Sequence, residues 1–184
     1  MANYRKHKPQ LRVEFNFQCP YCHTREPEIG GAKSFHIDHY KPKKKFPDLI
    51  CEYQNLIYSC RDCNNYKSDY WPVGIDRLMG REIIYLRPPE AINNHLDVSD
   101  LKWKAKTRKG SWNIEKLNLN SKINVQRRDD RNQIQKTILM LRQIQENYRC
   151  DPNYLERQSE FDKAIFDIEE QINSLNSKIS GPQD

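Results

Sequence analysis

Two closely spaced pairs of cysteines constrain this chain more than any other feature of its sequence. Cys19 and Cys22 form one C-x-x-C pair, and Cys60 and Cys63 form a second. A gap of two residues lets both thiolates of a pair reach one ion, and two pairs complete a tetrahedron. Zn²⁺ accepts four sulfur ligands and has no redox chemistry. The spacing therefore predicts a zinc site that is structural rather than catalytic, because four thiolates close its coordination sphere.

The N-terminal segment and the lack of a long apolar run indicate an intracellular protein. The chain begins MANYRKHKPQ, and no apolar run follows, so no signal peptide is expected. No stretch approaches the roughly 18 apolar residues of a membrane-spanning helix. We therefore expect a cytoplasmic protein without membrane contact and with reduced thiols. Redox-active C-x-x-C pairs are the competing interpretation, but no thioredoxin-like pattern accompanies them. Cys51 and Cys150 have no partner spacing and are expected to be buried thiols, and His23 a surface histidine.

The residues between the two cysteine pairs predict a small α+β unit. Apolar and polar residues alternate over 35–39, which indicates a strand, and Lys-Pro-rich residues 41–47 indicate a loop. Residues 56–58 form a second apolar run, and residues 64–70 contain nothing that breaks a helix. The order strand, loop, strand and helix within residues 1–70 is the first predicted domain.

The rest of the chain divides into two further predicted regions. Residues 71–120 form a small mixed extension, with a strand over 82–86 and a hairpin over 101–112 that turns near Lys109-Gly110. Residues 121–184 are expected to form an antiparallel helical hairpin, with Pro152 between its helices. Its apolar positions either bury each other or form a docking surface for a partner chain or a second copy. These positions are Ile134, Ile138 and Leu141, and then Phe161, Ile165, Ile168, Ile172, Leu175 and Ile179 at heptad spacing.

The zinc pairs bracket residues that suit phosphodiester hydrolysis. A neutral imidazole such as that of His39 titrates near working pH and can take a proton from water. Asp38 offers a carboxylate oxygen and Asn64 an amide oxygen, the hard ligands that Mg²⁺ and Mn²⁺ prefer. His36 shares a strand face with Asp38 and is expected to be a supporting histidine.

Basic residues near these groups suit a polyanionic partner. Lys and Arg exceed Asp and Glu by six, and each phosphate neutralised by a protein releases counterions. The lysines Lys41, Lys43, Lys44 and Lys45 follow the predicted strand, and Lys67 lies one helical turn beyond Asn64. We expect these lysines to contact a nucleic-acid backbone, with Arg127, Arg128 and Arg131 as additional candidates.

The combined motif resembles the HNH endonuclease family, also called His-Me finger nucleases, in its four-cysteine zinc form. The order is Asp38-His39, then Asn55 sixteen residues later, then Cys60-x-x-Cys63-Asn64-x-x-Lys67. The resemblance implies a ββα-metal finger in which Asp38 and Asn64 hold one divalent metal and His39 activates water. It also implies that Asn55 tethers the loop that orients His39. Asn64 replaces the histidine of the family's name, which favours Mg²⁺ or Mn²⁺.

Residues after the finger resemble the tail of a subset of bacterial HNH proteins that are encoded with an ATPase in anti-phage defence systems. The resemblance rests on Trp103, Thr107–Gly110 and Leu117–Asn120. The sequence thus predicts a metal-dependent endonuclease of duplex DNA that acts in defence with a partner ATPase or through self-association. The alternative is a non-catalytic zinc module that binds nucleic acid or a partner protein.

Overall fold

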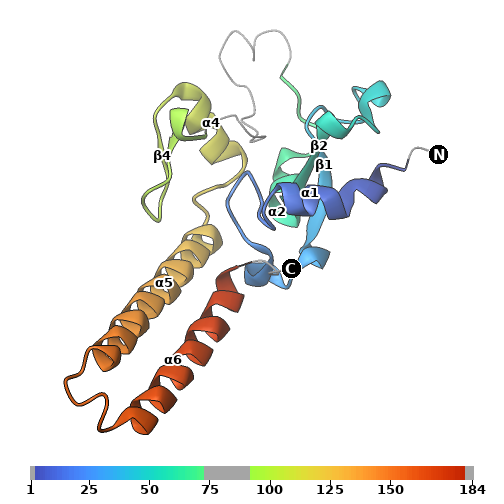
Figure 1. The fold of residues 1–184 in the computed structure, drawn as a ribbon. Helices are drawn as coiled ribbons and strands as arrows, with labels where there is room; N and C mark the ends of the chain where they lie inside the picture. Colours follow the sequence, from blue (N-terminus) through green and yellow to red (C-terminus); the bar gives the residue numbers. More distant parts are fainter. Residues whose placement is uncertain (1–2, 73–91, 181–184) are drawn as a thin grey trace.

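An antiparallel pair of strands lies at the centre of the N-terminal part (Figure 1). The structure is a computed structural model and describes residues 3–72 and 92–180. Strand β1 (Phe35–His39) pairs with β2 (Leu56–Cys60), so that Phe35 lies opposite Cys60 and His39 opposite Leu56. The second strand thus runs two residues beyond its prediction. All of β2 is buried, because α1 (Lys8–Glu14) and α2 (Arg61–Lys67) pack against it.

Helix α2 spans Arg61–Lys67, whereas the sequence predicted residues 64–70. The helix begins earlier because the Sγ atom of Cys60 accepts a hydrogen bond from the backbone NH of Cys63 and caps the first turn. It ends earlier because Ser68 has a φ of 50° and a ψ of −142°, a backbone conformation that does not continue a helix. One of the four cysteines predicted to bind zinc is therefore also the residue that starts this helix.

Short 3₁₀ turns, a two-stranded ribbon and one further helix are also found among the described residues up to Lys116. The turns are η1 (Tyr4–His7), η2 (Glu26–Ile29), η3 (Ala32–Ser34), η4 (Pro47–Leu49), η5 (Tyr53–Asn55) and η6 (Ile92–Asn94). Strand β3 (Leu96–Asp97) pairs with β4 (Lys104–Ala105), and helix α4 (Arg108–Lys116) follows. The predicted strand over 82–86 lies outside the described residues.

The predicted hairpin over 101–112, with its turn near Lys109-Gly110, is wrong. Both turn residues lie in α4, which Thr107 caps by accepting a hydrogen bond from the NH of Gly110. Gly110 is needed there for packing rather than for a turn, because an added Cβ would lie 2.1 Å from the carbonyl oxygen of His95. A glycine that permits close backbone approach has the same sequence signature as a turn glycine.

The C-terminal hairpin consists of α5 (Lys122–Arg149) and α6 (Gln158–Ile179), which lie side by side (Figure 1). The predicted apolar positions pack together between the helices, with Ile138, Ile168 and Ile172 buried in the same cluster. The hairpin extends away from the N-terminal part, so its tip near residues 150–157 is remote from β1 and β2 (Figure 1).

No helix among the described residues is long and apolar enough to cross a membrane.

Polar contacts hold the base of the hairpin against the first cysteine pair. The guanidinium of Arg131 in α5 forms two bonds to the Glu28 carboxylate, at 2.7 and 2.9 Å, and donates to the carbonyl of His23. Arg25 donates to the carbonyl of Ile179 at the end of α6. The hairpin therefore emerges from the same region of the molecule that carries the cysteine cluster.

Candidate functional site

The four predicted zinc ligands lie together in the core. The Sγ atoms of Cys19, Cys22, Cys60 and Cys63 are all within 4.8 Å of one another, and all four residues are buried. A tetrahedral Zn²⁺ with Zn–S bonds of about 2.3 Å separates its sulfurs by about 3.8 Å. The Sγ atoms of Cys22 and Cys60 are 3.7 Å apart. The cluster therefore fits a structural zinc ion in both ligand chemistry and spacing.

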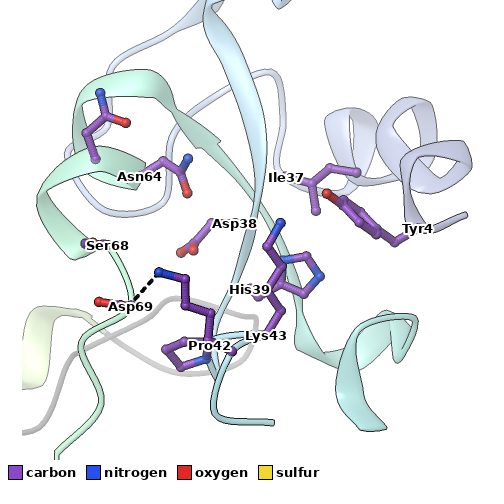
Figure 2. Close-up of a pocket in the computed structure, with 11 residues that line it drawn as sticks. Tyr4, Ile37, Asp38, His39, Pro42, Lys43, Asn64, Ser68 and Asp69 are labelled. Carbon is purple, nitrogen blue, oxygen red and sulfur yellow. Dashed lines mark hydrogen bonds and ion pairs between the residues drawn. The ribbon is translucent and has the colours of Figure 1, made fainter. Parts of the chain in front are cut away.

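A pocket of about 530 Å³ opens beside this cluster, between β1, the loop after it and α2 (Figure 2). Asp38, His39 and Asn64 all line it. Asp38 and His39 come from the end of β1, and Asn64 comes from the middle of α2, next to Cys63. The three residues that the sequence selected for hydrolysis thus face one space, whose other walls include Tyr4, Ile37, Pro42 and Lys43.

The Asp38 carboxylate is buried and engaged on both oxygens. Oδ2 accepts a hydrogen bond of 2.8 Å from the hydroxyl of Tyr21, and Oδ1 accepts one of 3.0 Å from the ammonium of Lys67. Burial raises the pKa of Asp38, while Lys67 and Tyr21 oppose that rise by favouring the charged form. A carboxylate oxygen has about two lone-pair directions, so each oxygen retains one for another ligand.

The His39 ring is held in one orientation by two neighbours. Its Nε2 lies 3.0 Å from the carbonyl oxygen of Ile50, and its ring meets the ring of Tyr4 edge to face at 4.7 Å. A carbonyl oxygen only accepts, so Nε2 carries the proton and Nδ1 of the neutral ring keeps a free lone pair. Burial lowers the pKa of His39, which favours this neutral form.

Asn55 closes the loop that lies between β1 and β2. Its Oδ1 accepts from the backbone NH of Lys41, and its Nδ2 donates to the carbonyl oxygens of Lys41 and Leu49. Leu49 precedes Ile50, the residue whose carbonyl meets His39. Because Asn55 is 5% exposed and satisfies three backbone groups at once, it fixes the path of this loop relative to His39.

The Asn64 side chain points toward Asp38 across the pocket (Figure 2). Within the part of the chain that the structure describes, no hydrogen-bond partner occupies its amide. One carboxylate and one amide oxygen on the same wall form a donor set that suits Mg²⁺ or Mn²⁺, since both ions bind a few protein oxygens and retain other positions for water or phosphate. His36 lies on β1 but is exposed and outside this pocket.

The predicted lysine loop lies at the mouth of the pocket. Lys43, Lys44 and Lys45 are exposed, and the first two line the pocket. Lys44 reaches across to Asp69 at 3.4 Å, as the dashed line in Figure 2 shows. Lys41 is half-buried and lies over the rings of Phe46 and Trp71.

Lys67 does not lie where the sequence analysis expected it. Its side chain is 0% exposed and its ammonium bonds to Asp38 and, at 2.7 Å, to the carbonyl oxygen of His39. In this position it has no access to a nucleic-acid backbone. The prediction was wrong because a lysine one turn after Asn64 on a short helix faces the core, where a buried carboxylate offsets its charge.

Other expectations about polar residues also need correction. Arg128 is buried over the Trp103 ring, and Arg131 is paired with Glu28, so both hold the fold together rather than face a nucleic acid. The guanidinium of Arg127 forms an ion pair with the carboxylate of Asp62, with 3.8 Å between nitrogen and oxygen. Cys51 and Cys150 are exposed, not buried, and His23 is half-buried edge-on to Trp103 rather than a surface residue.

Sequence reasoning missed Tyr21, Tyr4 and Ile50 as parts of the site. Tyr21 had one available signal, its place between two zinc-ligand cysteines, which fixes its backbone close to the core. Tyr4 and the carbonyl of Ile50 had none, because an aromatic residue near the N-terminus and a backbone oxygen in a loop have no motif. Their contributions arise only from the fold.

Comparisons with known proteins agree with the motif. Residues 19–70 match the family model described as HNH endonuclease. The chain is 27% identical over 117 residues to the Septu protein PtuB of Bacillus thuringiensis. That match covers 61% of this chain and 42% of the relative, so the chain spans about two-fifths of that protein's length. No solved structure matches the chain significantly.

Proposed function

We propose that the unit at residues 19–70, which matches the HNH endonuclease family, hydrolyses phosphodiester bonds of DNA with His39 as the general base. One observation supports this most strongly: Asp38, His39 and Asn64 line a single pocket between β1 and α2. The pocket is open to solvent beside exposed lysines, as a site for a large polyanion requires.

In this proposal, Nδ1 of His39 takes a proton from the attacking water. The carbonyl of Ile50 accepts from Nε2 and leaves Nδ1 as the basic atom, and Tyr4 and the loop closed by Asn55 keep the ring aligned. A base held within reach of its water contributes about 10²–10⁴ in rate. The depressed pKa of His39 keeps the imidazole unprotonated and ready at neutral pH.

The proposed metal-binding residues are Asp38 and Asn64. A bound Mg²⁺ or Mn²⁺ supplies Lewis-acid stabilisation of the charge that develops on the phosphate. The protein's part is to present the carboxylate from the end of β1 and the amide oxygen from α2. The zinc in that cluster is proposed to serve the fold only.

A cleavage assay with defined metals tests this function. We expect plasmid DNA to be cut with Mg²⁺ or Mn²⁺, and not after removal of free divalent ions by a chelator too weak to extract the zinc. Asn64→Ala should raise the metal concentration needed for half-maximal cleavage by at least about tenfold. Loss of an oxygen ligand lowers metal affinity more than loss of a residue that only supports a ligand.

Asn132→Ala, an exposed substitution on α5, is the matched control and should leave this concentration unchanged. DNA binding without product at any metal concentration would refute the nuclease and favour the non-catalytic zinc module. Single-stranded DNA and RNA in the same assay define the substrate class.

The lysine loop is proposed to hold the DNA backbone. Replacing Lys43, Lys44 and Lys45 by glutamine should weaken DNA binding at every sequence tested. The slope of log affinity against log salt should fall by about one for each phosphate that the loop no longer neutralises. Fluorescence anisotropy across a salt series measures both effects.

Replacing Lys102, Lys104 and Lys106 by glutamine removes the same charge from the β3–β4 ribbon and should change the salt slope little. Equal effects of the two triple substitutions would mean that net charge, not the loop, governs binding.

We further propose that the nuclease serves a bacterial anti-phage defence system together with a partner ATPase. Support comes from the tail motif and from similarity to a Septu protein. The tail residues form one structural unit: Trp103 and Asn120 exchange two backbone–side-chain hydrogen bonds, and Thr107 caps α4. The remote tip of the helical hairpin provides a surface for the partner or for self-association. This role requires cleavage in cells, so nuclease-deficient variants should lose protection against phage.

A further inference from the structure

Two buried side chains clamp the Asp38 carboxylate. Tyr21 is 2% exposed and donates to Oδ2, while Lys67 is fully buried and donates to Oδ1. Lys67 also donates to the carbonyl of His39, so one ammonium joins both residues at the end of β1. Buried polar groups that satisfy one another in this way fix a single side-chain orientation.

Both clamping residues lie close in sequence to cysteines of the cluster. Tyr21 lies directly before Cys22, in the turn where the NH of His23 bonds to the carbonyl of Cys19. Lys67 lies one helical turn after Cys63 on α2, a helix that Cys60 caps. The positions of the two donors therefore follow from the same four sulfurs that hold the zinc.

We propose that Tyr21 and Lys67 are positioning residues through which the structural zinc sets the geometry of the catalytic metal ligand Asp38. The inference rests on the proposed function, because it assigns Asp38 to the divalent ion. A carboxylate has about four lone-pair directions. One donor on each oxygen leaves one direction per oxygen and fixes the carboxylate plane relative to Asn64.

The physical reason for the clamp is the location of Asp38. Its side chain is only 5% exposed, so solvent does not supply hydrogen bonds that would orient it. Without the two donors, the carboxylate would rotate about its χ2 torsion, which is a soft degree of freedom. Fixing it in advance reduces the ordering that metal binding would otherwise require.

The test is the isosteric substitution Tyr21→Phe in the zinc-loaded full chain. Mn²⁺ binding is followed by the decrease of the free-ion electron paramagnetic resonance signal, and cleavage is titrated with Mn²⁺ in parallel. We expect Mn²⁺ affinity to fall by about tenfold or more, the usual effect of removing a group that orients a metal ligand. The cleavage rate at saturating Mn²⁺ should be largely recovered, since the base and both ligands remain.

Tyr58→Phe is the matched control. It removes another buried tyrosine–carboxylate bond, from Tyr58 to Glu26, in the same core but outside the pocket. Tyr58→Phe should lower thermal stability without changing Mn²⁺ affinity, and both variants should retain one zinc per chain. If Tyr21→Phe does not fold, Lys67→Arg offers a second measurement, because it keeps the charge and changes only the geometry of the clamp.

The outcomes separate the inference from the proposed function. Unchanged Mn²⁺ affinity in folded Tyr21→Phe or Lys67→Arg, with normal Mn²⁺ binding by the parent, would overturn the inference and leave the nuclease intact. Failure of the parent protein to bind Mn²⁺ or to cut DNA would overturn both. An equal loss of affinity in Tyr58→Phe would show a general effect of stability and would also overturn the inference.

Discussion

His39→Ala should reduce DNA cleavage by about 10²–10⁴-fold while the protein stays folded and zinc-loaded. The imidazole lines the pocket and keeps a lone pair on neutral Nδ1, since the carbonyl of Ile50 holds its Nε2. Alanine removes that lone pair and leaves Asp38 and Asn64 in place. The effect should therefore appear in the rate at saturating metal and DNA rather than in DNA affinity. Initial rates on supercoiled plasmid, with binding measured separately, distinguish the two.

His36→Ala provides the control for this substitution. His36 lies three residues earlier on the same strand, is exposed, and is outside the pocket. The His36→Ala protein should cut DNA at close to the parent rate. Cells that carry this variant should keep any protection against phage that His39→Ala abolishes. A folded His39→Ala protein that cuts as fast as the parent would refute the assignment of the base.

Cys63→Ser should release the zinc and unfold the N-terminal part of the chain. Structural zinc sites contribute an apparent binding free energy of order 10 kcal/mol, which is comparable to the whole stability of a typical domain of about 5–15 kcal/mol. Cys63 is buried, and its neighbours on α2 are Asn64 and, one turn on, Lys67. Removal of its sulfur should thus abolish cleavage together with the fold. Zinc content, circular dichroism and thermal unfolding record the effect.

Cys51→Ser is the comparison that isolates the metal from general cysteine chemistry. Cys51 is exposed and outside the cluster, so its replacement should preserve zinc content, thermal unfolding and cleavage. A Cys63→Ser protein that retains one equivalent of zinc and unfolds at the parent's temperature would exclude the proposed ligand set.

The elements with strong local patterns were predicted from the sequence alone. Alternation over 35–39 predicted β1, and the heptad spacing predicted the positions that pack between α5 and α6. Local signals were insufficient where a tertiary contact decided the structure. The fold of residues 101–112 depends on the carbonyl of His95 packing on Gly110, which no window of local sequence reveals.

Burial explains the errors among individual residues. Lys67 and Arg128 were predicted to be exposed cations, yet one balances Asp38 and the other packs on Trp103. Cys51 and Cys150 were predicted to be buried, yet both lie in exposed segments. Composition gives the average environment of a residue type. The actual environment depends on partners that are distant in the chain.

The sequence by itself determined which four cysteines cluster, the strand–strand–helix order of the finger and three of the side chains that line the pocket. It did so because ligand spacing and residue chemistry are local properties of a chain. The tertiary structure alone decided which nitrogen of His39 meets a backbone carbonyl and how Asp38 is held. Those properties depend on a carbonyl at Ile50, a hydroxyl at Tyr21 and an ammonium at Lys67, groups that folding brings from separate segments to within hydrogen-bonding distance.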